Sequence, residues 1–142
     1  MNLKPLDDVG SMEDVVVDRL RLSKQFLEDA EDLLARRSYH SVANRTYYAI
    51  FKAISAVHAV HGTGYKSHRE ALAEFNRTYV NEGVFPKEYG KNIHKAAKLR
   101  HSSDYSDFAK VTESEAAEQV QFAAAFLQSV WRYCEQELQR SI

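Results

Sequence analysis

Apolar residues recur at spacings of three and four along most of this chain, and no segment alternates apolar and polar residues over a useful length. Spacings of three and four place side chains on one face of an α-helix, whereas alternation is typical of a β-strand. The first such row contains Val16, Leu20, Leu27 and Leu34. The sequence therefore predicts an all-α fold.

Capping residues, glycines and prolines divide this pattern into four long helices and one short one. The predicted helices run from Ser11 to about Arg37, from Ser38 to His61, from Ser67 to before Gly83, from Pro86 to beyond Arg100, and from Thr112 to about Leu138. The second helix is apolar around much of its circumference, so we expect it at the centre. We predict an antiparallel up-and-down bundle, with the long helices around one core and the short helix across one end.

The length of 142 residues suits one domain, 1–142, in which residues 1–10 lack periodicity and are predicted to form a flexible arm. The net charge of −1 argues against a chain that is basic as a whole, so any affinity for RNA would come from a local patch. No stretch resembles a secretion signal or is long enough to span a membrane. We expect a cytoplasmic protein without a membrane association.

Metal and cofactor motifs are weak in this sequence. The pairs His58 with His61 and His94 with His101 could each share a helix face, but no third ligand stands at a matching position. We therefore predict partly exposed helix histidines, no metal site and no cofactor. The only cysteine, Cys134, lies on an apolar stripe and is interpreted as a buried small hydrophobe.

The segment KAAKLRHSSDYSDF, residues 95–108, concentrates charged and titratable residues around a predicted helix end. Two of its lysines, Lys95 and Lys98, recur with the preceding Lys91 on one helical ridge. This ridge is either a solvated helix face or a positive strip that contacts RNA or nucleotide phosphates. Likewise, Arg100 is either a phosphate contact or the partner of Asp104, which stands four residues later.

Polar residues also interrupt the central helix. Asn44 and Tyr48 share a face, and Arg45 points about a hundred degrees away. Polar groups in a central helix need partners. A carboxylate on a neighbouring helix is the natural partner for Arg45, and Asp104 is a candidate. We also take Asn44 and Arg45 as candidates for RNA or nucleotide contacts.

Three groups of residues in this order resemble the HEPN family of small helical proteins. They are Asn44-Arg45 with Tyr47-Tyr48, Lys66-Ser67-His68, and Arg100 with Asp104-Tyr105, and the resemblance extends from about Arg36 to Glu135. It implies a homodimer with a cleft between the copies. It also implies the toxin half of a toxin–antitoxin pair, with a minimal nucleotidyltransferase as the antitoxin.

The resemblance further implies a metal-independent endoribonuclease that uses arginine, four to six residues, and then histidine. This sequence departs from that pattern, because position five after Arg100 is Tyr105 and the only nearby histidine is His101. On a regular helix His101 would point away from the face of Arg100, so we expect it to assist only if the helix breaks at Ser102-Ser103. Whether the protein is an enzyme stays open.

The candidate catalytic residues are therefore Arg100, His101, Asp104 and Tyr105. Tyr105 is also a candidate for modification with AMP by the transferase, as the family resemblance implies. The alternative is a dimeric module without catalytic activity that binds nucleotide, RNA or the transferase through the same cleft.

Overall fold

The computed structural model describes residues 11–105 and 110–142, without the side chain of Tyr105. Its elements are α2 (Met12–Ala35), α3 (Tyr39–Val60), α4 (His68–Phe75), a π-helical turn η1 (Asn76–Val80), α5 (Glu88–Tyr105) and α6 (Glu113–Leu138). Within the described residues there is no strand, so the predicted all-α fold is confirmed. The arm predicted for residues 1–10 lies outside the described residues.

The helix boundaries follow the capping residues. Three hydroxyls each accept a hydrogen bond of 3.1 Å from the backbone N–H three residues later: Ser11 from Asp14, Ser67 from Glu70 and Thr112 from Glu115. These contacts satisfy N–H groups that the first turn of a helix leaves unpaired. After α3 and η1 the chain turns at Gly62 and Gly83, whose φ values of 70° and 82° favour glycine.

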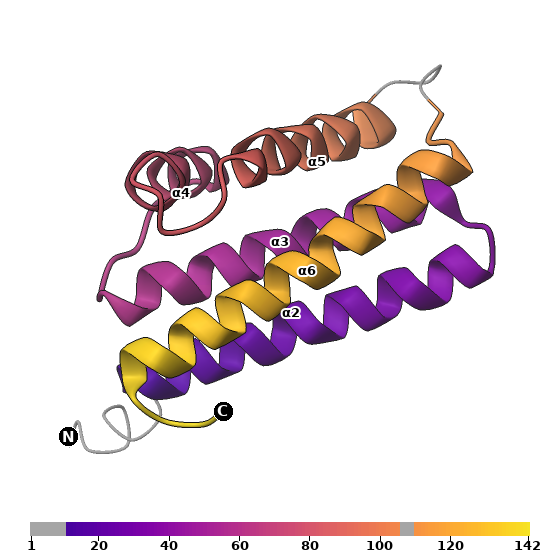
Figure 1. Ribbon diagram of the computed structural model, residues 1–142. Coiled ribbons are helices and arrows are strands. Elements are labelled where there is room, and N and C mark those ends of the chain that lie inside the picture. Colours follow the sequence, from indigo (N-terminus) through magenta and orange to yellow (C-terminus); the bar gives the residue numbers. More distant parts are fainter. Residues whose placement is uncertain (1–10, 106–109) are drawn as a thin grey trace.

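The helices run up and down, and α3 lies at the centre of the bundle as predicted. α2 and α6 pack on one side of α3, while α4 and α5 follow one another along its other side (Figure 1). One detail differs from the prediction, because α5 packs mainly on α3 and only slightly on α6. The buried residues of α5 are few, Ile93, Ala96 and Ser103, so it offers little surface to a second helix.

An aromatic cluster joins α6 to the side of α3 that carries α4 and α5. Phe126 on α6 is fully buried, and its ring centroid lies between 5.5 and 6.4 Å from those of Phe75, Phe85, Tyr89 and Phe122. Such aromatic pairs are stabilising beyond the area that they bury. Phe126 therefore holds two layers of the bundle together.

The short third helix also differs from the prediction. It does not continue to Gly83 as one α-helix, since α4 ends at Phe75 and the chain goes on as η1. A Cβ atom at Gly90 would lie 2.5 Å from Oδ1 of Asn76. Glycine at this position thus lets α5 approach η1 closely, which hydrophobic periodicity did not indicate.

Two residues that we weighed for chemistry are buried. His58 is only 3% exposed, and its Nε2 lies 2.9 Å from the carbonyl oxygen of Ala71, so the expectation of a partly exposed histidine is wrong. This contact ties α4 to α3. Cys134 is fully buried as predicted, and burial raises the pKa of its thiol to about 12, which keeps it protonated.

In the described part of the chain, no helix has both the length and the apolar character required to cross a membrane.

We expect Phe126→Ala to destabilise the fold by about 3–5 kcal/mol, because it opens a cavity inside the aromatic cluster. Leu22→Ala is the matched control, since Leu22 is 38% exposed and its change should stay within about 0.5 kcal/mol. Urea unfolding of both variants measures the difference. Equal effects of the two substitutions would contradict the central place of Phe126.

We expect the fold to lose stability as the pH falls through about 6.5, the ordinary histidine pKa. Burial lowers the pKa of His58 in the folded protein. The unfolded chain therefore binds a proton that the folded chain excludes, and the free energy of unfolding decreases on acidification. Urea unfolding at pH 7.5 and pH 5.5 should show a smaller decrease for His58→Gln than for the wild type. An unchanged decrease would mean that other groups cause it.

Candidate functional site

A cavity of 480 Å³ lies between α3, α4 with η1, and α5. It is lined by Tyr47, His68, Arg69, Leu72, Ala73, Asn76, Gly90, Ile93, His94, Ala97, Arg100 and His101. Among the described residues, this lining includes two arginines and three histidines but no carboxylate. The cavity therefore combines apolar walls with groups that favour an anion.

Arg100 stacks on the aromatic residues of α3. The central carbon of its guanidinium lies 4.6 Å from the ring centroid of Tyr47 and 5.9 Å from that of Tyr48. Both distances are in the range of cation–π attraction. This stacking fixes the plane of the guanidinium at the edge of the cavity and ties the C-terminal half of α5 to α3.

The guanidinium keeps unused hydrogen-bonding capacity. Nη1 of Arg100 lies 3.4 Å from Oδ2 of Asp104, which is a long contact for a hydrogen bond. An arginine has five N–H donors, so this carboxylate does not satisfy them all. Burial opposes the charge of Arg100, but the nearby Tyr48, Tyr47 and Asp104 outweigh it and raise the pKa of the guanidinium. Arg100 is therefore a permanent cation in the cavity.

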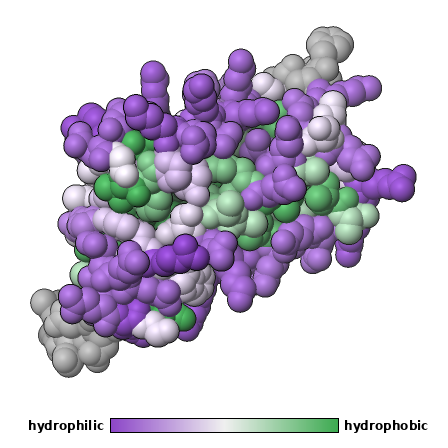
Figure 2. All heavy atoms as spheres, viewed as in Figure 1, coloured by the Kyte–Doolittle hydropathy of each residue, from purple (hydrophilic) through white to green (hydrophobic). Residues whose placement is uncertain are grey.

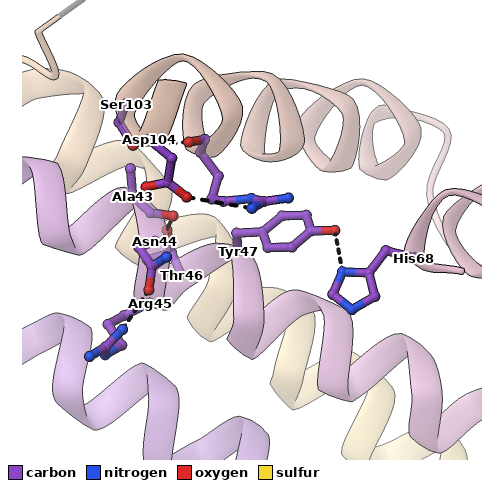
Figure 3. Close-up of polar contacts among 9 residues, drawn as sticks. Ala43, Asn44, Arg45, Thr46, Tyr47, His68, Ser103 and Asp104 are labelled. Carbon is purple, nitrogen blue, oxygen red and sulfur yellow. Dashed lines mark hydrogen bonds and ion pairs between the residues drawn. The ribbon is translucent and has the colours of Figure 1, made fainter. Parts of the chain in front are cut away.

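His68 is held from two sides at the start of α4. Its ring stacks on Phe51 with centroids 3.8 Å apart and planes 25° apart. Its Nδ1 lies 3.1 Å from the hydroxyl of Tyr47, which points toward it in Figure 3. Together these contacts fix the orientation of an exposed imidazole beside Arg100.

Burial and charge keep both members of this pair neutral near pH 7. Burial raises the pKa of Tyr47, although the charge of Arg100 acts in the opposite direction. Burial also lowers the pKa of His68, and the charges of Arg100 and Lys52 lower it further. The empty site therefore contains an unprotonated imidazole next to a fixed cation.

The predicted pairing of Arg45 with Asp104 is wrong. Nη1 of Arg45 donates to Oδ1 of its neighbour Asn44, and Figure 3 shows Arg45 turned away from Tyr47 and His68. Asp104 instead contacts Arg100, the alternative that the four-residue spacing left open. The link between α3 and α5 is thus the stacking of Arg100 on Tyr47. Neither Asn44 nor Arg45 lines the cavity.

The expectation that an unbroken helix turns His101 away from Arg100 is also wrong. α5 stays helical through Ser102-Ser103 to Tyr105, and His101 still lines the same cavity as Arg100. Residues one position apart diverge by about 100°, and this cavity is wide enough for both side chains to reach it. The side chain of Tyr105 lies outside the described residues, so its proposed roles stay predictions.

The lysine ridge divides between two sides of α5. Lys91 lines a shallow groove together with Asn76 and His94, both of which also line the cavity. Lys95 instead lies 3.7 Å from Glu118 on α6, and Lys98 is exposed. Of the three predicted lysine contacts, Lys91 is thus the one beside the cavity.

Several cavity residues were absent from the predicted site, above all Tyr47, His68, Arg69 and His94. His68 was noticed only as part of the family resemblance. A signal existed, because a histidine directly after a helix-capping serine stands at a helix start. His68 stands 32 positions before Arg100, and tertiary packing brings the two residues together. Hydrophobic periodicity does not reveal such packing. Among residues 11–105 and 110–142, no group of three or more histidine, cysteine or acidic side chains is placed to hold a metal.

Comparison with known proteins agrees with this fold and with the resemblance in its motifs. The HEPN domain family model matches residues 16–135. A UPF0332 protein of Thermotoga maritima is 32% identical over 115 residues, which cover 81% of this chain and 87% of that protein. A protein of Methanocaldococcus jannaschii named "Putative toxin MJ0605" is 30% identical over 111 residues, which cover 78% of this chain and 82% of that protein.

We expect Tyr47→Phe to reduce the free energy of unfolding by about 0.5–1.5 kcal/mol, because it removes the hydrogen bond to His68 and keeps the ring under Arg100. Tyr65→Phe is the matched control, since Tyr65 is 37% exposed. Urea unfolding measures both changes. A Tyr47 variant as stable as the control would show that the hydroxyl does not contribute to stability.

Proposed function

The chain belongs to the HEPN domain family, and on this premise we propose that it is a toxin-like protein that acts on RNA at the cavity beside Arg100. One observation carries this proposal. The guanidinium of Arg100 lies against Tyr47 at the edge of a cavity whose lining, in the part of the chain that the structure describes, has five arginine or histidine side chains and no carboxylate. A phosphodiester fits this chemistry, because it brings a negative charge and several hydrogen-bond acceptors.

The local distribution of charge supports RNA over a neutral ligand. Lys91 continues the basic surface along the groove next to the cavity, although the chain as a whole has a net charge of −1. Cations that contact phosphates release counterions from RNA, so binding weakens as salt is added. The apolar walls of Leu72, Ile93 and Ala97 offer a surface for a base or a ribose.

The wider role in this proposal is that of a toxin controlled by a minimal nucleotidyltransferase. The toxin name of the archaeal relative supports the first part. Modification of Tyr105 by the transferase belongs to the same proposal, since this residue follows Asp104 at the end of α5. A cytoplasmic location is expected for such a pair.

A homodimer is also part of this proposal. Figure 2 shows hydrophobic side chains in a band across the middle of one face, with hydrophilic side chains on both sides of it. Between α2 and α6, a groove of 420 Å³ has an apolar floor of Leu27, Ala124, Leu127 and Trp131 and is also lined by Lys24, Gln128, Arg132 and Glu135. Apolar surfaces of this kind are common where two proteins meet. They give a second copy or the transferase a place to bind.

Metal-independent cleavage of the bound RNA is the chemistry that we propose for this site, and binding without cleavage is the alternative. Attack of a ribose 2′-OH on the adjacent phosphate needs proton transfer and a cation near the developing charge. Arg100 supplies the cation, and the imidazoles of His68 and His101 line the same cavity. The contact between Asp104 and Arg100 is long, so a phosphate could displace this carboxylate from the guanidinium.

We expect the purified protein to bind a labelled single-stranded RNA of mixed sequence, with an affinity that decreases as salt increases. Arg100→Ala should weaken binding about tenfold, which corresponds to roughly 1.4 kcal/mol. Arg21→Ala is the matched control, because Arg21 is an exposed arginine on α2 that lines neither the cavity nor the groove between α2 and α6. The same mixtures, kept with EDTA, are then analysed for products with 2′,3′-cyclic phosphate ends.

The outcomes separate the two versions of the proposal. Cleavage by the wild type that disappears in Arg100→Ala supports the nuclease. Intact RNA with binding that depends on Arg100 supports the module without catalytic activity. Binding that is absent, or equal in the Arg100 and Arg21 variants, would contradict the assignment of RNA to this cavity. Circular dichroism of each variant confirms that the fold is retained.

A further inference from the structure

His68 is a second candidate ligand contact in the cavity beside Arg100, and it stands on a different helix. It is the first residue of α4, whereas Arg100 stands near the end of α5. The ring cannot turn without losing its stacking on Phe51 and its contact with Tyr47. Within residues 11–105 and 110–142, Nδ1 is occupied by the Tyr47 hydroxyl and Nε2 has no hydrogen-bond or ion-pair partner. Nε2 is therefore the atom of the imidazole available to a ligand.

The charges around His68 come from every helix that packs against it. They favour its neutral form in the empty site, where Arg100 and Lys52 are the cations that act on it most strongly. The other ionisable groups of its surroundings are Tyr47 and Tyr48 on α3, Arg69 on α4, and His94, His101 and Asp104 on α5. Asp104 is the only carboxylate among these groups, and it contacts Arg100.

A bound phosphodiester would favour the protonated form of His68 over the neutral form. Its negative charge would lie beside the guanidinium and compensate the cation that now disfavours a protonated His68. An imidazolium with Nδ1 held by the Tyr47 oxygen has Nε2–H as a second, charged donor toward a phosphate oxygen. The same tether that orients the neutral ring thus also suits the protonated one, since a tyrosine hydroxyl can accept or donate a hydrogen bond.

We propose that His68 is a phosphate-recognition residue of this site and takes up a proton when a phosphodiester binds beside Arg100. This inference rests on the proposed function, because it assumes that the anion in the cavity is a nucleic-acid phosphate. The proposal assigns the second phosphate contact to His68 on α4, so that the ligand lies between α4 and α5.

Binding is then linked to pH with a definite sign. Between the two pKa values of His68, the complex binds more protons than the separate molecules, by a fraction of one, so affinity increases as the pH falls. A shift of one unit corresponds to a tenfold change in affinity. We therefore expect binding to be about tenfold tighter at pH 5.5 than at pH 7.5.

The test uses the full chain and a 2′-O-methyl RNA oligonucleotide, which keeps the phosphodiesters and lacks the nucleophilic 2′-OH. Fluorescence anisotropy at constant ionic strength gives the affinity at pH 5.5, 6.5 and 7.5. His68→Gln keeps a neutral donor near the position of Nε2 and cannot be protonated. We expect its affinity to increase much less than that of the wild type between pH 7.5 and pH 5.5.

His94 and His101 also line the cavity, so the double variant His94→Gln/His101→Gln is the matched control. It should keep most of the pH dependence. In addition, the imidazole carbon-bound proton signals in an NMR titration should show a higher pKa for His68 in the complex than in the protein alone, with His68→Gln used to assign the signal.

Each result decides between named alternatives. The same pH dependence in His68→Gln and in the wild type would overturn the role of His68, as would an unchanged pKa of His68 in the complex. If the wild type binds through Arg100 at both pH values without any pH dependence, the proposed function stands and this inference fails. If the wild type does not bind the oligonucleotide at all, both are overturned.

Discussion

The whole structure depends on the burial of α3. This helix has apolar residues around most of its circumference, so it has to be covered on more than one side. α2 and α6 cover one side, and α4 with α5 covers the other (Figure 1). The candidate site lies on this second side, where contacts that include polar groups hold α4 and α5 against α3. His58 holds α4 through a carbonyl oxygen, and Arg100 holds the far part of α5 through Tyr47.

Arg100 attaches α5 to α3 and is also our proposed phosphate contact, two roles that a purely apolar packing would have kept apart. α5 has few buried apolar residues, and near its end the stacked guanidinium takes the place of a hydrophobic side chain. A cation used in this way is partly desolvated, since its side chain is 20% exposed, and it is weakly satisfied by Asp104. Electrostatic attraction to a ligand is stronger in such surroundings than in bulk water. The residue that attaches α5 is thus also well prepared to receive an anion.

The sequence allowed the prediction of local features and not of the meeting of distant residues. Serine and threonine caps and the three-to-four spacing of apolar residues are local, and the helices, their order and the central place of α3 followed from them. The motif around Arg100 was also recognised. The sequence left two candidate partners for Asp104, because Arg45 and Arg100 are both cations that a carboxylate could pair with. Only the packing of α5 selects Arg100. His68 escaped the site prediction for the same reason, since nothing local relates a residue at the start of α4 to the end of α5.

The position of His68 changes how we interpret the histidine that the family spacing would place after Arg100 on α5 and that this sequence lacks. A spacing of four to six residues is one way to bring an imidazole near an arginine, and helix packing is another. Here His68 and His101 come to the cavity from α4 and α5, although α5 lacks the expected spacing. Cleavage and recognition would use opposite forms of His68, because a general base has to be unprotonated and a phosphate-binding imidazolium has to be protonated. Burial, Arg100 and Lys52 all favour the first form by lowering the pKa of His68, whereas a phosphate beside Arg100 would favour the second. On the proposed function, the balance between these two charges, and not the spacing of the motif, would decide which chemistry the site performs.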